Sequence, residues 1–179
     1  EQTFAKGDRD FSPQLTQIKA QNPDAIICSA LVEEASGIVN QARQLGIPKT
    51  VPIIGGNGFN SPALMKNAGE AAEGVVVGAA WNMSSANPLN LKFVDDYTKK
   101  FNRPPDQFAA QAFVGMHIVY QAAKAAGTAD NRKAIRDALV KIKDMDTVLG
   151  RLSFTEGRDA DHPPVVQEVK GGKFIVFAR

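Results

Sequence analysis

The strongest candidate for a binding site in the sequence is a glycine-rich loop, Gly55-Gly56-Asn57-Gly58, which follows an apolar run. Glycine lets a backbone approach a ligand closely and tolerates positive φ angles. The glycine spacing does not match a phosphate-binding loop, and no Walker-type lysine follows it. The loop is therefore either part of a small-molecule site, with the Asn57 amide as donor and acceptor, or a tight strand-to-helix turn.

The remaining reactive side chains do not form a catalytic set. Cys28 is the only cysteine and lies in an apolar run, which predicts a buried thiol and leaves neither a disulfide nor a thiol cluster for zinc. His117 lies among apolar neighbours, and His162 is expected in a surface loop. Glu33 and Glu34 begin a predicted helix, where carboxylates favour the positive end of the helix dipole. We therefore expect no enzyme activity, no metal and no cofactor.

Composition narrows the class of protein further. The 179 residues are 44% apolar and 22% charged, as in a soluble globular protein, with a net charge of +2. No dense basic run suggests a nucleic-acid partner, and no stretch approaches the roughly 18 apolar residues of a membrane span. The chain opens Glu1-Gln2-Thr3-Phe4, without an initiator Met or a signal peptide, so we expect it to start within a longer protein.

The first eighty residues alternate predicted strands and helices. Apolar runs predict strands, and helical periodicity with Ser-Pro starts and a closing Gly46 predicts helices. The strands are Ala25–Ser29, Val51–Ile54 and Gly74–Ala80, and the helices are 12–21, 33–45 and 61–69. This alternation is typical of a doubly wound parallel α/β sheet, in which we expect Ala25–Ser29 to be covered on both faces.

The pattern changes after Trp81. Three helices are predicted without intervening strands, at 89–101, at 107–126 and from 130 onward. From Thr147 the chain turns to strands again, at 149–154 and in a terminal hairpin of 165–169 and 173–177. The 107–126 helix is apolar over most of its surface, so it should be buried against something large. The simplest explanation is that its sheet lies in an absent N-terminal half; in the 179-residue chain alone, a second copy in a homodimer or rearranged packing would cover it.

Ligands in open α/β sheets bind beyond the carboxyl ends of the strands. That rule selects three loops, Ala30–Val32, Gly55–Phe59 and Ala80–Asn82. Phe59, Trp81 and Phe108 are candidate pocket walls, because aromatic rings give large apolar contacts with few rotatable bonds. Packing in a core is the alternative for each ring.

Six segments in order along the chain resemble one family. They are Phe11-Ser12 with Gln17–Ala20 and Asn22–Ile26, then Gln41–Gly46, Gly55–Pro62, Ala68–Val75, Pro105–Phe113 and Gly150–Phe154. These segments resemble the Leu/Ile/Val-binding family of type I periplasmic solute-binding proteins of ABC transporters, over its C-terminal half. The resemblance implies residues 1–82 in the second lobe, 83–146 as helices of the first lobe, and 147–179 back in the second.

What the resemblance implies for function is capture of a small molecule in the cleft between two lobes. Hinge closure would bury the ligand, and the membrane subunits of an ABC importer would recognise the closed form. A periplasmic or extracellular location follows, with the signal peptide upstream of residue 1.

The resemblance also places two residues in the ligand site. Asn57 stands where amino-acid-binding members carry an acidic residue that pairs with the α-ammonium of the ligand. A neutral amide does not compensate a buried ammonium, so aromatic or aliphatic carboxylates become candidates beside amino acids. Leu31 stands where those members can place an aromatic residue, which is consistent with an apolar pocket.

Two alternatives belong to other functional classes. A ligand-sensing module of the same fold would be favoured by a fused DNA-binding or signalling domain. A Rossmann-type enzyme would bind nucleotides, and the glycine pattern argues against it.

Overall fold

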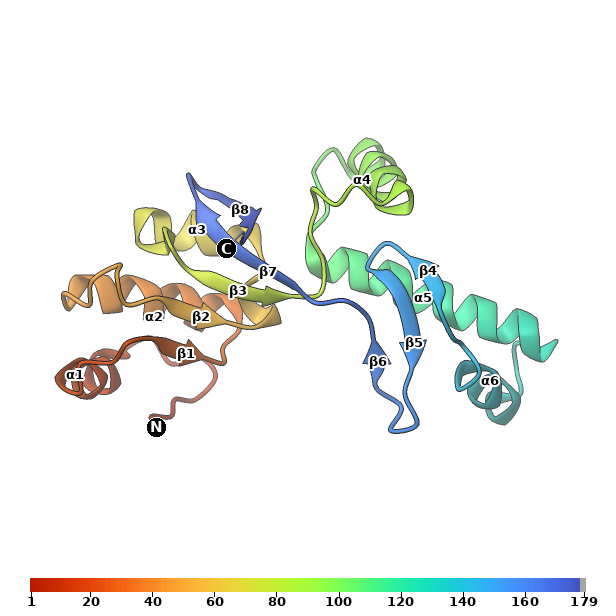
Figure 1. Ribbon diagram of the computed structural model, residues 1–179, viewed down its shortest axis with the longest axis horizontal. Coiled ribbons are helices and arrows are strands. Elements are labelled where there is room, and N and C mark those ends of the chain that lie inside the picture. Colours follow the sequence, from red (N-terminus) through yellow and green to blue (C-terminus); the bar gives the residue numbers. More distant parts are fainter. Residues whose placement is uncertain (178–179) are drawn as a thin grey trace. The chain divides into compact units, whose positions relative to one another are not determined.

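The computed structural model describes residues 1–177, which form two compact units. One unit comprises Glu1–Ala79 and the C-terminal segment that starts at Val165, and the other comprises Ala80–Pro164. We call them the sheet unit and the helical unit (Figure 1). From the sequence we expected residues 147–179 to rejoin residues 1–82. In the structure, residues 147–164 instead pack with the helices, and only the segment from Val165 joins the sheet unit.

The sheet unit is built on a five-stranded sheet in the order β1-β2-β3-β7-β8. The strands are β1 (Ile26–Cys28), β2 (Ile53–Gly55), β3 (Val76–Ala79), β7 (Val165–Lys170) and β8 (Lys173–Val176). The first three are parallel, β7 runs antiparallel to β3, and β8 pairs with β7 as a hairpin. Both the parallel alternation and the terminal hairpin predicted from the sequence are confirmed.

Helix α1 (Ser12–Ala20) precedes β1, and two helices connect the parallel strands, α2 (Val32–Gln44) between β1 and β2 and α3 (Pro62–Ala68) between β2 and β3. Short 3-10 turns flank α3, η1 (Asn57–Phe59) before it and η2 (Gly69–Ala72) after it. Helix α3 begins as predicted, because the Ser61 side chain accepts from the Ala63 N–H and Pro62 fills the first turn. Gly46, just past α2, has φ +78°, as a terminating glycine should. The cap predicted at Ser12 lies instead at Phe11, whose ring is buried.

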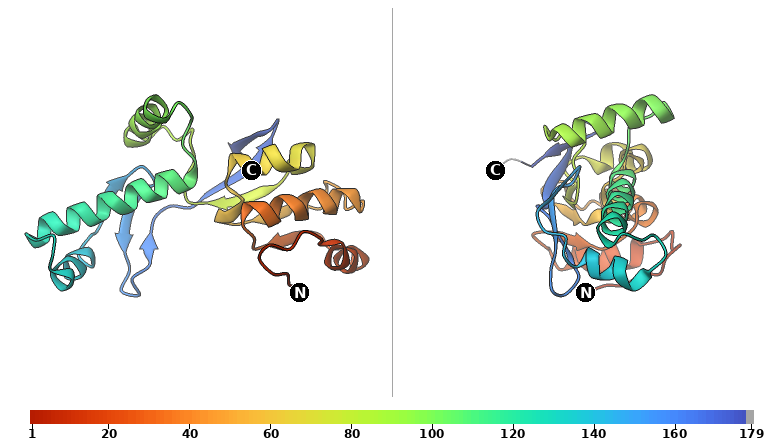
Figure 2. Two further views of the ribbon diagram at one scale, coloured as in Figure 1. Left: turned by 180° about the vertical axis from the view of Figure 1, so that it is seen from behind. Right: turned by 90° about the vertical axis from the view of Figure 1, so that its right-hand side faces the viewer.

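The core of the sheet unit lies on one face of its sheet. Alternate strand residues, including Ile26, Ile53 and Val77, pack against the buried sides of α2 and α3. Figure 1 shows the strands in front of α2, and Figure 2 (left) shows the helix in front when the molecule is seen from behind. The expectation that β1 is covered on both faces is wrong for this chain, because Ile27 on the opposite face is 86% exposed.

The helical unit combines α4 (Pro88–Phe101), α5 (Gln107–Ala126) and α6 (Arg132–Leu139) with a three-stranded antiparallel sheet. Its strands are β4 (Met145–Thr147), β5 (Gly150–Phe154) and β6 (Ala160–Asp161). Val148 and Leu152 share one buried cluster with Trp81, Phe93 and Val114. This cluster explains why residues 147–164 belong with the helices.

Helix α5 is the long helix predicted from the sequence, capped by the Asp106 side chain, which accepts from the Ala109 N–H at 2.8 Å. Only a narrow stripe of this helix is buried, along Ala110, Val114, Ile118 and Ala122. Its other large apolar residues stay exposed, with Met116 at 70%. The cover expected for this helix is therefore incomplete within residues 1–177.

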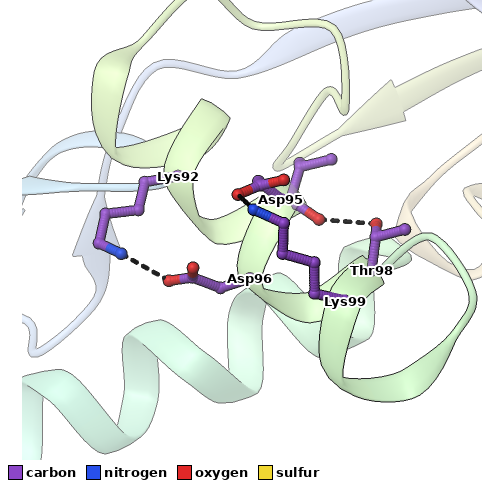
Figure 3. A network of polar contacts seen from close by, with 6 residues as sticks. Lys92, Asp95, Asp96, Thr98 and Lys99 are labelled. Carbon is purple, nitrogen blue, oxygen red and sulfur yellow. Dashed lines mark hydrogen bonds and ion pairs between the residues drawn. The ribbon is translucent and has the colours of Figure 1, made fainter.

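The outer side of α4 is charged and solvated (Figure 3). Lys92 Nζ lies 2.8 Å from Asp96 Oδ2, and Lys99 Nζ lies 2.6 Å from Asp95 Oδ2, both one helical turn apart. The Thr98 hydroxyl donates to the carbonyl of Val94, four residues earlier, at 2.7 Å. Exposed pairs of this kind add little to stability.

Candidate functional site

A cavity lies at the carboxyl ends of β1 and β2, where ligands bind in open α/β sheets. Its volume is about 440 Å³. The lining residues come from the N-terminal segment, the loop after β1, the first turn of α2 and the glycine loop: Phe4, Lys6, Ser29, Ala30, Leu31, Glu34, Gly56, Asn57 and Gly58. The structure therefore brings together Leu31 and Asn57, two of the five predicted site residues.

Glycines allow the two loops of this cavity to meet. A Cβ on Gly58 would lie 2.1 Å from the carbonyl oxygen of Ala30, so no larger residue fits without a backbone shift. A Cβ on Gly55 would lie 2.2 Å from the ring of Phe59. The glycine-rich sequence thus serves tight packing of the turn, and that packing holds Asn57 at the cavity.

The cavity offers polar and apolar contacts side by side. Leu31 is 49% exposed and presents an aliphatic side chain at the N-terminus of α2. Asn57 is also exposed and begins η1, with an amide that can both donate and accept. Such a combination suits a small organic molecule that has an apolar part and polar groups.

Glu34 is a cavity residue that the sequence analysis had assigned only to the helix dipole. Its side chain is 7% exposed, and its Oε1 accepts from the Gly7 N–H at 2.8 Å. Hydrogen bonds from the backbone N–H of Gly7 and from its own N–H hold the pKa of this carboxyl below its usual value, and Lys6 lowers it further. The cavity is thus lined by one fixed carboxylate and one ammonium. A signal was present in the sequence: an acidic residue in the first turn of the helix that follows the first strand.

The three aromatic candidates lie elsewhere. Phe59 is fully buried in the core of the sheet unit, directly under the glycine loop. Trp81 and Phe108 belong to the helical unit. Trp81 is 4% exposed and its Nε1–H donates to Asn90 Oδ1 at 2.6 Å, whereas Phe108 is 45% exposed in the first turn of α5. Their contact with a ligand stays a prediction.

The other groups that could take part in chemistry are the Cys28 thiol and possible metal ligands. Cys28 is buried, and burial raises the pKa of its thiol from 9.0 to about 11, so it is a poor nucleophile near neutral pH. In residues 1–177, no group of three or more His, Cys, Asp or Glu side chains could hold a metal ion. No helix in this part of the chain is long and apolar enough to cross a membrane.

The helical unit carries a second, more apolar cavity of about 360 Å³. Its lining includes four aromatic rings of α4 and α5, and the charged side chains of α4 also border it: Phe93, Tyr97, Phe101, Phe113, Lys92, Asp96 and Lys100. Its walls belong to the incompletely covered side of these helices.

The sequence of this chain is similar to those of known binding proteins. A family model described as periplasmic binding protein matches residues 1–173. The Leu/Ile/Val-binding protein of Escherichia coli is 29% identical over 171 residues, which are 96% of this chain and 42% of that protein. The Leu/Ile/Val-binding protein BraC3 of Rhizobium johnstonii is 26% identical over 153 residues, or 86% of this chain and 41% of that protein. The chain thus spans about two fifths of the curated relatives that it matches.

Solved structures of solute-binding proteins have the same fold as this chain. The leucine-binding protein LivK of Thermotoga maritima superposes with a TM-score of 0.89 at 32% identity, covering 98% of this chain and 49% of that one. LivJ of Streptococcus pneumoniae, in complex with isoleucine, superposes with a TM-score of 0.82 at 36% identity, covering 96% of this chain and 49% of that one. A solute-binding protein of Rhodopseudomonas palustris BisB5, in complex with 3,4-dihydroxybenzoic acid, gives 0.79 at 26% identity, covering 94% and 48%.

Proposed function

Because this chain belongs to the periplasmic binding protein family and has its type I α/β fold, we propose that it forms one half of the ligand cleft of a solute-binding protein. The observation that carries the proposal is the cavity at the carboxyl ends of β1 and β2, in which Leu31 and Asn57 meet. A fold of this kind places ligands at that edge, and the glycine loop is packed so as to hold Asn57 there.

The mechanism is capture by closure of two lobes. The sheet unit supplies one wall, and the other wall comes from the lobe to which we assign the helices of residues 83–146. A ligand stabilises the closed state only by its higher affinity for that state, so both walls must contribute contacts. No catalytic step is part of this proposal.

The ligand is a small molecule with a carboxylate, either an amino acid or an aromatic or aliphatic acid. Asn57 brings an amide and no charge, and therefore suits a carboxylate, a carbonyl or a hydroxyl of the ligand. Binding of an amino acid requires a negative charge near its ammonium, and Glu34 is the carboxylate that lines this cavity. Both ligand classes are represented among the relatives: one was solved with isoleucine and another with 3,4-dihydroxybenzoic acid.

Delivery completes the proposed role. The protein would work in the periplasm or outside the cell and present its closed form to the membrane subunits of an ABC importer. The LivJ relative is described as a substrate-binding protein of a branched-chain amino-acid transporter, which supports this partner.

A thermal-shift panel on the complete two-lobed protein tests the proposal. The panel sets leucine, isoleucine and valine against benzoate, 3,4-dihydroxybenzoate and aliphatic acids. A ligand at 100 times its dissociation constant adds about 2.7 kcal/mol, which raises the melting temperature measurably. A shift with any of these compounds supports solute binding. No shift with any of them contradicts the proposal and favours a sensing module with another ligand.

A further inference from the structure

Two charged side chains line the cavity at the carboxyl ends of β1 and β2, Lys6 and Glu34, and their surroundings differ. The Glu34 carboxylate is buried and accepts hydrogen bonds from the backbone N–H of Gly7 and from its own N–H. Lys6 is exposed, and its ammonium forms no hydrogen bond or ion pair with any other residue that the structure describes. The charge that this cavity leaves available to a ligand is therefore the positive charge of Lys6.

A tight turn presents Lys6 at the cavity. The Asp8 N–H donates to the Ala5 carbonyl oxygen at 3.1 Å, and the Ala5 N–H donates to Asp8 Oδ2 at 2.7 Å. Gly7, the third residue of the turn, has φ +92°, in the region that a type II turn requires at that position. The backbone of Lys6 is thus held in place, so only its side chain has to be ordered when a ligand binds.

Helix α2 anchors the segment that contains this turn. The Gly7 N–H donates to Glu34 Oε1 at 2.8 Å. Two helical turns further along α2, Gln41 Oε1 accepts from the Phe11 N–H at 2.7 Å. These contacts fix the place of Lys6 relative to α2, whose first turn also lines the cavity.

Closure of the cleft changes the surroundings of the Lys6 ammonium. The two lobes of the proposed mechanism enclose the ligand, and a charge that loses its water then needs a partner of opposite sign. Glu34 already accepts from two backbone N–H groups, whereas a carboxylate of the ligand arrives without a partner. Hydrogen bonds between an ammonium and a carboxylate are about twice as strong as those between neutral groups. Lys6 and the ligand carboxylate therefore match in charge.

We propose that Lys6 is a specificity-determining residue, which binds the carboxylate of the ligand from this wall of the cleft. The inference rests on the proposed solute-binding function and adds to it the place of the ligand's negative charge. Asn57 and Leu31 line the same cavity and supply its neutral contacts. An uncharged analogue of the ligand, with a primary amide in place of the carboxylate, should then gain nothing from Lys6 beyond a neutral hydrogen bond.

Paired ligands and matched variants test the proposal. Titration calorimetry on the complete two-lobed protein compares each acid that binds with its primary amide: 3,4-dihydroxybenzoate with 3,4-dihydroxybenzamide, and isoleucine with isoleucinamide. The variants are Lys6→Gln and the control Lys49→Gln, which removes the same charge at an exposed position before β2. We expect Lys6→Gln to reduce the preference for the acid over the amide by about tenfold or more, because direct contact couples the two changes, and Lys49→Gln to leave it unchanged.

Two further measurements separate binding from folding. Lys6→Arg keeps the positive charge and should keep most of the preference for the acid. Without ligand, Lys6→Gln should melt at the same temperature as the unmodified protein, because an exposed side chain without a partner adds little to stability.

Two results would overturn the proposal. The same preference for the acid in Lys6→Gln and in the unmodified protein would place the carboxylate elsewhere in the cleft. An equal loss of affinity for acid and amide in Lys6→Gln would mean that Lys6 pairs with the opposite lobe. Solute binding by the unmodified protein stands in both cases. If the unmodified protein binds none of the compounds, the proposed function fails, and this inference fails with it.

Discussion

Replacing Gly58 by alanine should destabilise the chain through a single added methyl group. The new Cβ would lie 2.1 Å from the Ala30 carbonyl oxygen and 3.2 Å from the Cα of Leu31. Ordinary contact with that oxygen requires a separation of more than 3 Å, so the two loops must part by about 1 Å. Overpacking of this kind costs about 1–3 kcal/mol. For a chain of this length, 2 kcal/mol lowers the melting temperature by about 4–8 °C.

The matched control is Gly56→Ala, two positions earlier in the same loop. A Cβ there meets nothing within 4 Å, and the backbone of Gly56 is already extended. Alanine should therefore be neutral or slightly stabilising, since it restricts the unfolded chain. Thermal unfolding followed by circular dichroism measures both variants. Equal melting temperatures for Gly58→Ala and Gly56→Ala would refute the claim that close approach of the two loops requires Gly58.

Four further predictions concern the cores and the thiol. Trp81→Phe removes the donor to the buried Asn90 oxygen and should lower the free energy of unfolding by about 1–3 kcal/mol. Urea denaturation followed by circular dichroism measures this loss, and an unchanged midpoint would show that the hydrogen bond adds nothing. Leu64→Ala, at a fully buried position of the sheet unit, should cost about 2–5 kcal/mol in the same assay, and a loss below 1 kcal/mol would mean that the site collapses freely. The pKa of Cys28 is raised from 9.0 to about 11, so its reaction with a disulfide reagent should be slow at pH 8 and fast after denaturation. The same shift should lower stability as the pH rises from 9 towards 11, because only the unfolded thiol ionises in that window.

Local signals in the sequence were enough to locate most elements. Ser61 and Pro62 start α3, Gly46 terminates α2, and Gly171-Gly172 joins the last two strands. These features depend on neighbouring residues and on backbone sterics, so they can be predicted without knowledge of the packing. The cap predicted at Ser12 failed by one residue: Ser12 is already the first helical residue, and Phe11 before it is the N-cap residue without a side-chain cap hydrogen bond.

Features that depend on distant packing were not accessible in the same way. An apolar run such as Ile26–Cys28 predicts a strand but does not reveal that only one of its faces is covered within this chain. Likewise, Val148 and Leu152 pack with Trp81 and the helices, and no local pattern distinguishes that cluster from the other core. In the candidate site, the edge rule selected the two loops, and the family resemblance singled out Leu31 and Asn57 within them. Glu34 was missed because a carboxylate at a helix start already has a sufficient local explanation.

The central claim is that the cavity at the ends of β1 and β2 forms half of a ligand cleft, and Asn57 tests it most directly. Titration calorimetry on the complete protein would measure isoleucine and 3,4-dihydroxybenzoate binding to the unmodified protein and to Asn57→Ala. The control is Asn67→Ala, an exposed asparagine of α3 outside the cavity. We predict that whichever compound binds loses about tenfold or more in affinity with Asn57→Ala, since a hydrogen bond to a charged ligand group contributes about 1.5–3 kcal/mol, and that Asn67→Ala binds normally. Unchanged affinity in Asn57→Ala would contradict the assignment of the site.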